Sequence, residues 1–272
     1  SKEPTLSPIP SLSSILSSTS TVFWIMGWID WSLSSCCETE EVWFISMFGL
    51  YLVANAMLWN HPSNVLKPMK LIAVFAHEFG HAVMCWLTGG QVVQIEVYNN
   101  EGGVTRYRGG NRLAIIPAGY VGGAVFGGVF VAFSGSRIPA TIACCCFIVF
   151  LLGALFYAPN PTMTFLNLGF AVATLGAILL DWCFGVSPFI QFVCLYYGTT
   201  IGSFSVFDTI EDTVTRTAEG SDAVACSQVM PCCHPQCVGV QFALAGLFFL
   251  ALGVYFGLLW MIHDNTEMDV AE

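Results

Sequence analysis

The sequence predicts an all-α polytopic membrane bundle of about seven spans, within a range of six to eight, together with one small membrane-associated β-hairpin. Of its 272 residues, 56% are hydrophobic and only 10% are charged, whereas a soluble domain carries about 25% charged residues. The mean hydropathy is +0.71. Several segments of roughly 20 residues carry few charges, and a helix of that length crosses a hydrocarbon core of about 30 Å. We therefore expect an integral multi-pass membrane protein.

Residues 1–35 are predicted to form a disordered or interfacial segment ahead of the membrane domain. The first 20 residues are rich in Ser and Pro and lack the basic region and uninterrupted apolar core of a signal peptide. Tryptophan is enriched where a membrane meets water. Three tryptophans that suit this layer come next: Trp24, Trp28 and Trp31.

The first clear span candidate covers residues 42–59. The second, residues 71–87, would be only about 25 Å long as a helix. Five further spans are expected at about 113–133, 138–157, 164–182, 186–207 and 239–262. We place the membrane domain at 36–262, with a polar loop at 208–238 and an acidic tail at 263–272.

A β-hairpin is predicted at residues 91–108, where the apolar pattern breaks. Residues 91–98 read QVVQIEVY, with nearly alternating apolar side chains, and a run of Asn, Glu and Gly follows at 99–103. Asn and Gly supply the backbone conformations of tight hairpin turns. The simplest interpretation is an amphipathic hairpin at the membrane surface.

Glycines recur at every fourth position in the third predicted span, at Gly119, Gly123 and Gly127. Small residues at this spacing let helix backbones approach closely. We favour packing within the chain over a dimer interface, and the sequence leaves the oligomeric state open.

The charge balance argues against a nucleic-acid partner, because the formal net charge is -10 and the chain holds only eight Lys and Arg residues. Twelve cysteines leave the oxidation state open. The cluster Cys232-Cys233-His234-Pro235-Gln236-Cys237 has metal-ligand residue types at crowded spacing. Juxtamembrane cysteines are also acylation sites, and an inert loop is a third interpretation.

The strongest motif is His77-Glu78-Phe79-Gly80-His81 in the second predicted span, an H-E-x-x-H pattern. Histidines four residues apart lie on one helix face and can bind one Zn²⁺. Glu78 is then the candidate general base that takes a proton from water. Ionisable groups inside a membrane segment are costly and normally serve a shared purpose. We expect one Zn²⁺ per chain.

A third zinc ligand must come from elsewhere, because a catalytic zinc usually has three protein ligands. The remaining histidines lie in predicted loops or at a span end. Asp208 ends a long apolar run, and Asp212 follows four residues later on the same helical face. Either carboxylate is a candidate metal ligand, and the alternative for each is a solvated group at a span end.

Four motifs follow one another along the chain: AHEFGHA at 76–82, the Gly-rich segment ending EGGVTRYRGG, PAGYVGGAVFGG at 117–128 and FSVFDTIEDTVTRTAEGSDA at 204–223. Together they resemble the site-2-protease class of intramembrane metalloproteases. Within that class they are similar to the eukaryotic branch called peptidase M50B-like. The resemblance covers about residues 70–262.

The resemblance implies hydrolysis of peptide bonds in membrane-spanning protein substrates, in contact with membrane lipid. It assigns the zinc ligands to His77 and His81, the base to Glu78 and the third ligand to an aspartate of a later span. Members of the better-known branch carry that aspartate in a Leu-Asp-Gly sequence after an Asn-Pro pair. Here Asn160-Pro161 lies a whole span earlier and no Leu-Asp-Gly exists, so Asp208 and Asp212 both remain, with Asp208 deeper in the apolar run.

The same resemblance places the hairpin near the active site, where a strand edge would hold an unwound substrate by β-addition. Two other functions compete with catalysis. A non-catalytic membrane scaffold or chaperone would keep the fold without hydrolysis, although an intact Glu78 argues against it. A metal transporter would need polar residues along several spans, and apart from Asp181, Asp208 and the motif the predicted spans are nearly bare of them. The organelle and the substrate stay open.

Overall fold

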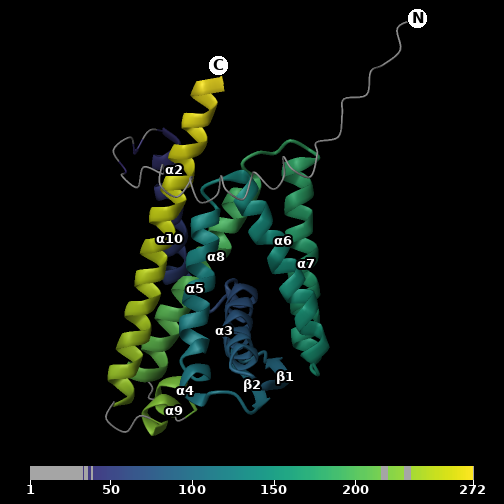
Figure 1. The fold of residues 1–272 in the computed structure, drawn as a ribbon, viewed down its shortest axis with the longest axis vertical. Helices are drawn as coiled ribbons and strands as arrows, with labels where there is room; N and C mark the ends of the chain where they lie inside the picture. Colours follow the sequence, from purple (N-terminus) through teal and green to yellow (C-terminus); the bar gives the residue numbers. More distant parts are fainter. Residues whose placement is uncertain (1–32, 34–35, 38, 216–219, 230–233, 272) are drawn as a thin grey trace, which may run out of the picture. The chain divides into compact units, whose positions relative to one another are not determined.

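The computed structural model describes residues 33, 36–37, 39–215, 220–229 and 234–271 (Figure 1). The three tryptophans and nearly all of the predicted N-terminal segment therefore lie outside the described residues. The same is true of Cys232 and Cys233 in the cysteine cluster.

Among the described residues, five helices are long and apolar enough to cross a membrane. They are α2 (Thr39–Leu58), α6 (Arg137–Ala154, with the short helix η1, Leu155–Tyr157), α7 (Pro161–Trp182), α8 (Phe189–Ile210) and α10 (Pro235–Ala271). The other two predicted spans form α3 (Lys67–Leu87) and α5 (Ala118–Phe133). Of these, α5 has only 16 residues, and α3 carries two lysines and a glutamate. The predicted all-α membrane bundle with a small hairpin is confirmed.

Helix α3 lies inside the bundle, where it contacts α5, α7 and α8. Most of its side chains are buried, and Ile72 and Ala82 are fully enclosed. This explains why a helix of modest hydropathy belongs to the membrane domain: other helices, rather than lipid, surround it. Ionisable groups at membrane depth normally face such an interior.

Close backbone contacts fasten α5 to its neighbours α8 and α10. A Cβ atom at Gly127 would lie 2.5 Å from the backbone nitrogen of Gly202 in α8. One at Gly253 of α10 would lie 2.5 Å from the carbonyl oxygen of Gly128. Only glycine permits such an approach, so the glycines of α5 pack within the chain as small residues do in membrane bundles.

The hairpin consists of β1 (Gln91–Val97) and β2 (Gly103–Arg108), paired antiparallel with an irregularity between Val92 and Gln94. The turn is closed by the Tyr98 amide, which donates to the carbonyl of Gly102 at 2.8 Å. At the tip, Glu101 adopts a positive φ of 67°. The Lys70 ammonium group of α3 pairs with the Glu101 carboxylate at 2.9 Å. The predicted hairpin is confirmed, and its tip is tied to α3.

The predicted polar loop contains two short helices that are absent from the predicted elements. After α8, the chain continues as a π-helical turn, η2 (Glu211–Thr215), and then forms α9 (Asp222–Val229). Helix α9 packs through a small apolar cluster separate from the main core. This cluster comprises Ile116, Tyr120, Ala223, Cys226, Val238 and Phe242. Figure 1 shows α9, α4 (Arg112–Ile115) and the hairpin at the same end of the bundle.

A partly buried ion pair joins the start of α6 to the end of α7, next to the start of α8. The Asp181 side chain is fully buried, accepts a hydrogen bond from the Arg137 guanidinium and also accepts one from the Ile190 amide. The Arg137 guanidinium additionally lies 4.1 Å from the Trp182 ring centre. Asp181 therefore caps the start of α8 while it neutralises Arg137.

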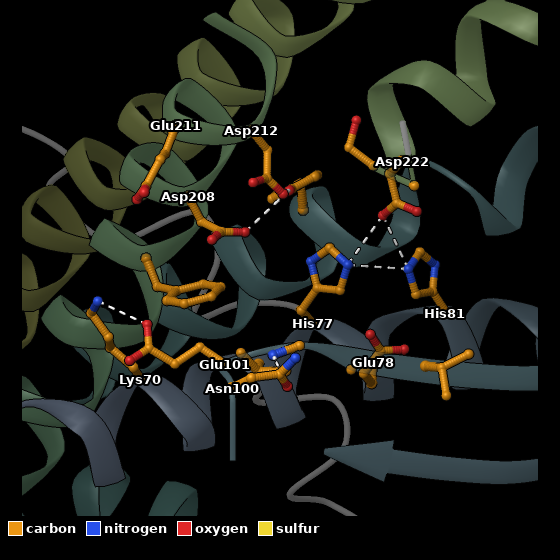
Figure 2. A pocket seen from close by; sticks show the side chains of 18 of the residues that line it. Lys70, His77, Glu78, His81, Asn100, Glu101, Asp208, Glu211, Asp212 and Asp222 are labelled. Atoms are coloured by element: carbon orange, nitrogen blue, oxygen red, sulfur yellow. Dashed lines mark hydrogen bonds and ion pairs between the residues drawn. The ribbon is translucent and has the colours of Figure 1, made fainter. Parts of the chain in front are cut away.

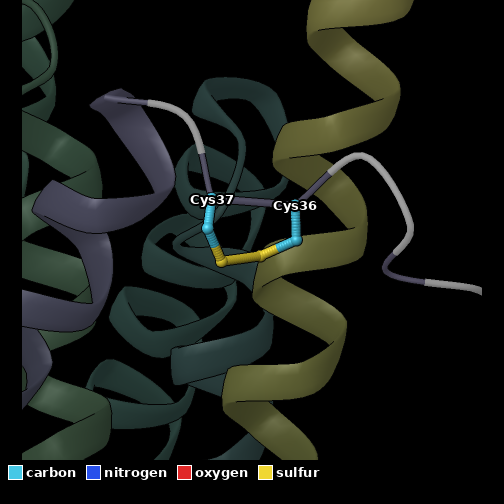
Figure 3. The surroundings of a disulfide bond; sticks show 2 residues. All are labelled: Cys36 and Cys37. Carbon is cyan, nitrogen blue, oxygen red and sulfur yellow. A yellow bond between two sulfur atoms is a disulfide. The ribbon is translucent and has the colours of Figure 1, made fainter.

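Adjacent cysteines Cys36 and Cys37, just ahead of α2, are joined by a disulfide bond (Figure 3). The other cysteines that the structure describes are free thiols. Cys144 and Cys194 are buried in the main core, where a thiol behaves as a small apolar group.

Candidate metal centre

Two histidines and a glutamate project from one turn of α3 into a common space. The ring centres of His77 and His81 are 4.9 Å apart, and their Nε2 atoms are 3.2 Å apart. Glu78 and His81 are buried. The four-residue spacing on a helix is responsible, because it places both rings on the same face one turn apart.

Besides the two histidines, a third potential metal ligand is Asp222, at the first turn of α9. Its Oδ2 atom lies 3.1 Å from Nε2 of His77 and 3.1 Å from Nε2 of His81. The three atoms therefore form a nearly equilateral triangle, which Figure 2 shows with its dashed lines. Ligand atoms around a tetrahedral zinc with bonds of about 2.0–2.1 Å are about 3.3 Å apart. The observed spacing is close to that of zinc ligands.

One polar atom of the triangle, Oδ2 of Asp222, is not satisfied within the part of the chain that the structure describes. Asp222 Oδ2 is buried, yet among the described residues it accepts no hydrogen bond that meets both distance and angle requirements. Burial by itself would raise the pKa of Asp222, but the two adjacent imidazoles outweigh it and hold the pKa below its ordinary value. A carboxylate and two ring nitrogens directed at one point are the arrangement that a divalent metal would satisfy.

His81 is held in one tautomer by the backbone. Its Nδ1 atom lies 2.7 Å from the carbonyl oxygen of Ile115 at the end of α4. A carbonyl only accepts hydrogen bonds, so Nδ1 carries the proton. In the neutral ring, Nε2 then presents its lone pair to the triangle. Metal-binding histidines commonly have this second hydrogen bond.

Gly119 of α5 leaves the space that a metal ion would need. A Cβ atom at this position would lie 2.5 Å from Nε2 of both histidines and 2.6 Å from Asp222 Oδ2. Any side chain here would therefore fill the centre of the triangle. The donor set of two nitrogens and one oxygen, together with this cradle, fits zinc.

Of the residues predicted from sequence, the structure brings together His77, Glu78 and His81, but not Asp208 or Asp212. The Tyr120 hydroxyl instead lies within hydrogen-bond distance of both aspartates, at 3.1 Å from Asp208 and 3.4 Å from Asp212, and can donate to one of them at a time. They lie at the end of α8 and in η2, whereas Asp222 lies in α9. Asp222 takes the place expected for Asp208 or Asp212.

The sequence held one local signal for Asp222. Ser221 accepts a hydrogen bond from the Val224 amide at 3.4 Å and so caps the start of α9. Serine followed by an acidic residue is typical of a helix N-terminus. That pattern indicates α9, but nothing local indicates that its first turn meets α3.

Asn160, of the Asn-Pro pair, serves the hairpin rather than the metal centre. Its side-chain amide donates to the carbonyl of Val97, at the end of β1, at 2.6 Å. The outer side of β1 is thereby fastened to the start of α7. Within the described residues the sheet has only two strands, so the outer side of β2 is an edge.

The triangle opens into a cavity of about 1000 Å³, at the upper end of the range of about 300–1000 Å³ usual for ligand pockets. Its walls include the α3 motif, Asp222 and β2 residues 103–105 and 107. Further acidic side chains line it: Glu101, Asp208, Glu211 and Asp212. Figure 2 shows the two imidazoles directed toward Asp222, with Glu78 beside them.

The family described as Peptidase M50B-like matches residues 48–253, which is more than half of the chain and includes every member of the triangle. Searches of curated proteins and of solved structures found no match. Five of the described helices are long and apolar enough to cross a membrane, and the family match shows that this chain belongs to the Peptidase M50B-like family of membrane metallopeptidases.

Proposed function

We propose that the protein is an intramembrane zinc metalloendopeptidase that hydrolyses peptide bonds of membrane-spanning proteins. The observation that carries this proposal is the triangle of His77, His81 and Asp222 with Glu78 beside it. Family membership and the five apolar helices support the protease activity and the membrane setting.

In this proposal, one zinc ion per chain is held by His77, His81 and Asp222. When bound there, zinc supplies Lewis-acid chemistry, polarising a substrate carbonyl and lowering the pKa of a coordinated water to about 7. The hydrogen bond from His81 to Ile115 keeps the ring oriented for binding. Asp222 contributes one negative charge, which offsets part of the charge of the cation.

Glu78 is the residue we assign as general base. Its carboxylate lies on the same helical turn as the two histidines and lines the cavity. It would take a proton from the attacking water and return it to the nitrogen of the leaving amine, so that the glutamate ends the cycle ionised.

The substrate would approach along β2. A membrane helix must unwind before its carbonyl can reach the metal centre, and its freed backbone groups then need partners. Strand β2 is an edge strand whose residues 103–105 line the cavity. We propose that the unwound segment pairs with this edge by β-addition.

Metal analysis with matched variants tests the proposal. The protein, purified in detergent and supplied with zinc, should contain one zinc per chain. Asp222→Ala should lose it, whereas Asp208→Ala and Asp212→Ala should keep it. Equal zinc in Asp222→Ala and the unmodified protein would refute the ligand assignment.

Cleavage is tested separately with a panel of tagged single-span membrane proteins, each co-expressed with the enzyme. Glu78→Gln should retain one zinc and release no fragment. A non-catalytic scaffold predicts no difference between the unmodified protein and Glu78→Gln across the panel. A transporter predicts zinc flux in sealed vesicles without fragment release.

A further inference from the structure

Thr105 of β2 contacts the glutamate of the α3 motif directly. Its hydroxyl oxygen lies 2.6 Å from Glu78 Oε2 and 2.9 Å from the backbone carbonyl oxygen of the same residue. A threonine hydroxyl has one proton and donates to one acceptor at a time. The carboxylate oxygen is closer and, when ionised, is the stronger acceptor, so the bond to Oε2 is the principal one.

The strand register explains why Thr105 faces Glu78. Thr105 pairs with Ile95 and Gly103 pairs with Val97. Residues paired across antiparallel strands point to the same face, and Ile95 and Val97 are fully buried in the main core. Thr105 and Gly103 are therefore on the buried face of the hairpin, which packs against α3.

Gly103 contributes by having no side chain. A Cβ atom there would lie 2.5 Å from Glu78 Oε1 and 2.6 Å from Glu78 Cγ. Alternate residues of one strand thus enclose the same carboxyl group, one by a hydrogen bond and the other by close backbone contact. This leaves the Glu78 side chain little room to change rotamer.

The hairpin that provides these contacts is itself anchored at two points, one in its turn and one in β1. Glu101 at the hairpin tip pairs with the buried Lys70 of α3 at 2.9 Å. Asn160 of α7 binds the carbonyl of Val97 in β1. Because the hairpin is fixed to two helices, Thr105 presents its hydroxyl from a preorganised position rather than from a loose loop.

We propose that Thr105 is a positioning residue that orients the Glu78 carboxylate, so that the hairpin is part of the catalytic apparatus as well as a surface for substrate. This inference rests on the proposed role of Glu78 as general base. Misplacement of reacting groups by about 1 Å can lower the rate by about 100-fold, so we expect a loss of about 10- to 100-fold when this hydrogen bond is removed. The effect falls on kcat, because Thr105 acts on the base rather than on zinc or substrate.

Two pairs of variants isolate the hydroxyl. Thr105→Val keeps the shape of threonine without the hydroxyl, and Thr105→Ser differs from Thr105→Ala by a single oxygen atom. We expect kcat about 10- to 100-fold lower in the Val and Ala variants. The Ser variant should recover most of the activity. KM within about twofold of the unmodified enzyme and one zinc per chain are expected throughout.

Thr164→Val is the matched control. Its hydroxyl also donates to a backbone carbonyl, that of Asn160 at 3.2 Å, and Thr164 is half-buried in α7 away from the cavity lining. Its kcat should equal that of the unmodified enzyme. A loss in Thr164→Val as large as that in Thr105→Val would mean a general packing effect and would overturn the inference.

The remaining outcomes separate this inference from the proposed function. If Glu78→Gln is inactive but Thr105→Val and Thr105→Ala keep full kcat, the positioning role is wrong and the protease assignment stands. If Thr105→Ser is as impaired as Thr105→Ala, the hydroxyl is not responsible and the inference fails. If Thr105→Val does not fold, the Ser and Ala pair decides. If the unmodified enzyme cleaves no protein of the panel that the Glu78→Gln variant leaves uncleaved, the proposed function itself fails.

Discussion

Gly119→Ala places a methyl group where the structure leaves room for a metal ion. The new Cβ atom would lie 2.5 Å from two histidine nitrogens and 2.6 Å from a carboxylate oxygen. Side-chain carbon atoms essentially never approach other heavy atoms within 3.0 Å. The three ligand atoms must therefore each move by at least about 0.4–0.5 Å, whereas metal–ligand distances tolerate only about 0.2 Å.

The expected result is a folded protein that does not bind zinc. Alanine favours a helix over glycine by about 0.8–1.0 kcal/mol, so the substitution does not weaken α5 as a helix. Zinc content, measured by elemental analysis after gel filtration in detergent, should fall from one per chain to below about 0.1. Circular dichroism should show unchanged helicity.

Gly169→Ala controls for the effect of adding a methyl group to a membrane helix. Gly169 lies in α7, and a Cβ atom there would meet nothing within 4 Å. This variant should bind one zinc per chain. If Gly119→Ala binds zinc as tightly as Gly169→Ala, the space beside Gly119 is not the metal position, and the assignment of the triangle is refuted.

Three further outcomes are expected. In Gly103→Ala, the added methyl group would displace the Glu78 carboxylate, so kcat should fall at least about 10-fold while the zinc content stays unchanged. A kcat equal to that of the unmodified enzyme would contradict the close contact. Arg137→Leu leaves the fully buried Asp181 without its cation. Because the Arg137 side chain is 35% exposed, we expect the free energy of unfolding to fall by about 1–3 kcal/mol, less than the about 3–5 kcal/mol lost when a fully buried pair is broken. The midpoint of thermal unfolding should therefore be lower, and an unchanged midpoint would show that the pair contributes nothing to stability. Phenanthroline should abolish cleavage by removing zinc, and added zinc should restore it; cleavage that persists in the metal-free protein would exclude a metallopeptidase.

The membrane bundle could be predicted because its signals are local in the sequence. Apolar runs define the helices, and alternation with an Asn- and Gly-rich turn defines the hairpin. Helix α9 could not be predicted in this way, because it is a short helix inside a polar connection. Its position depends on the cluster it forms with Tyr120 and Phe242, residues of two other helices.

The third residue of the triangle could not be predicted from sequence either, because its position also depends on contacts between distant segments. Asp208 lay at the end of an apolar run and so had the stronger sequence signal, yet its carboxylate meets the Tyr120 hydroxyl. Likewise, the alternation of the hairpin predicts two faces, but only the observed register shows that Thr105 meets Glu78.

The sequence by itself determined that two imidazoles and a carboxyl group share one turn of one helix, because that geometry depends only on the helical period. Only the tertiary structure decided which aspartate completes the group and which strand encloses Glu78. Those contacts join segments far apart in the chain. They arise from the packing of α9 against α5 and α10 and of the hairpin against α3, which no local pattern encodes.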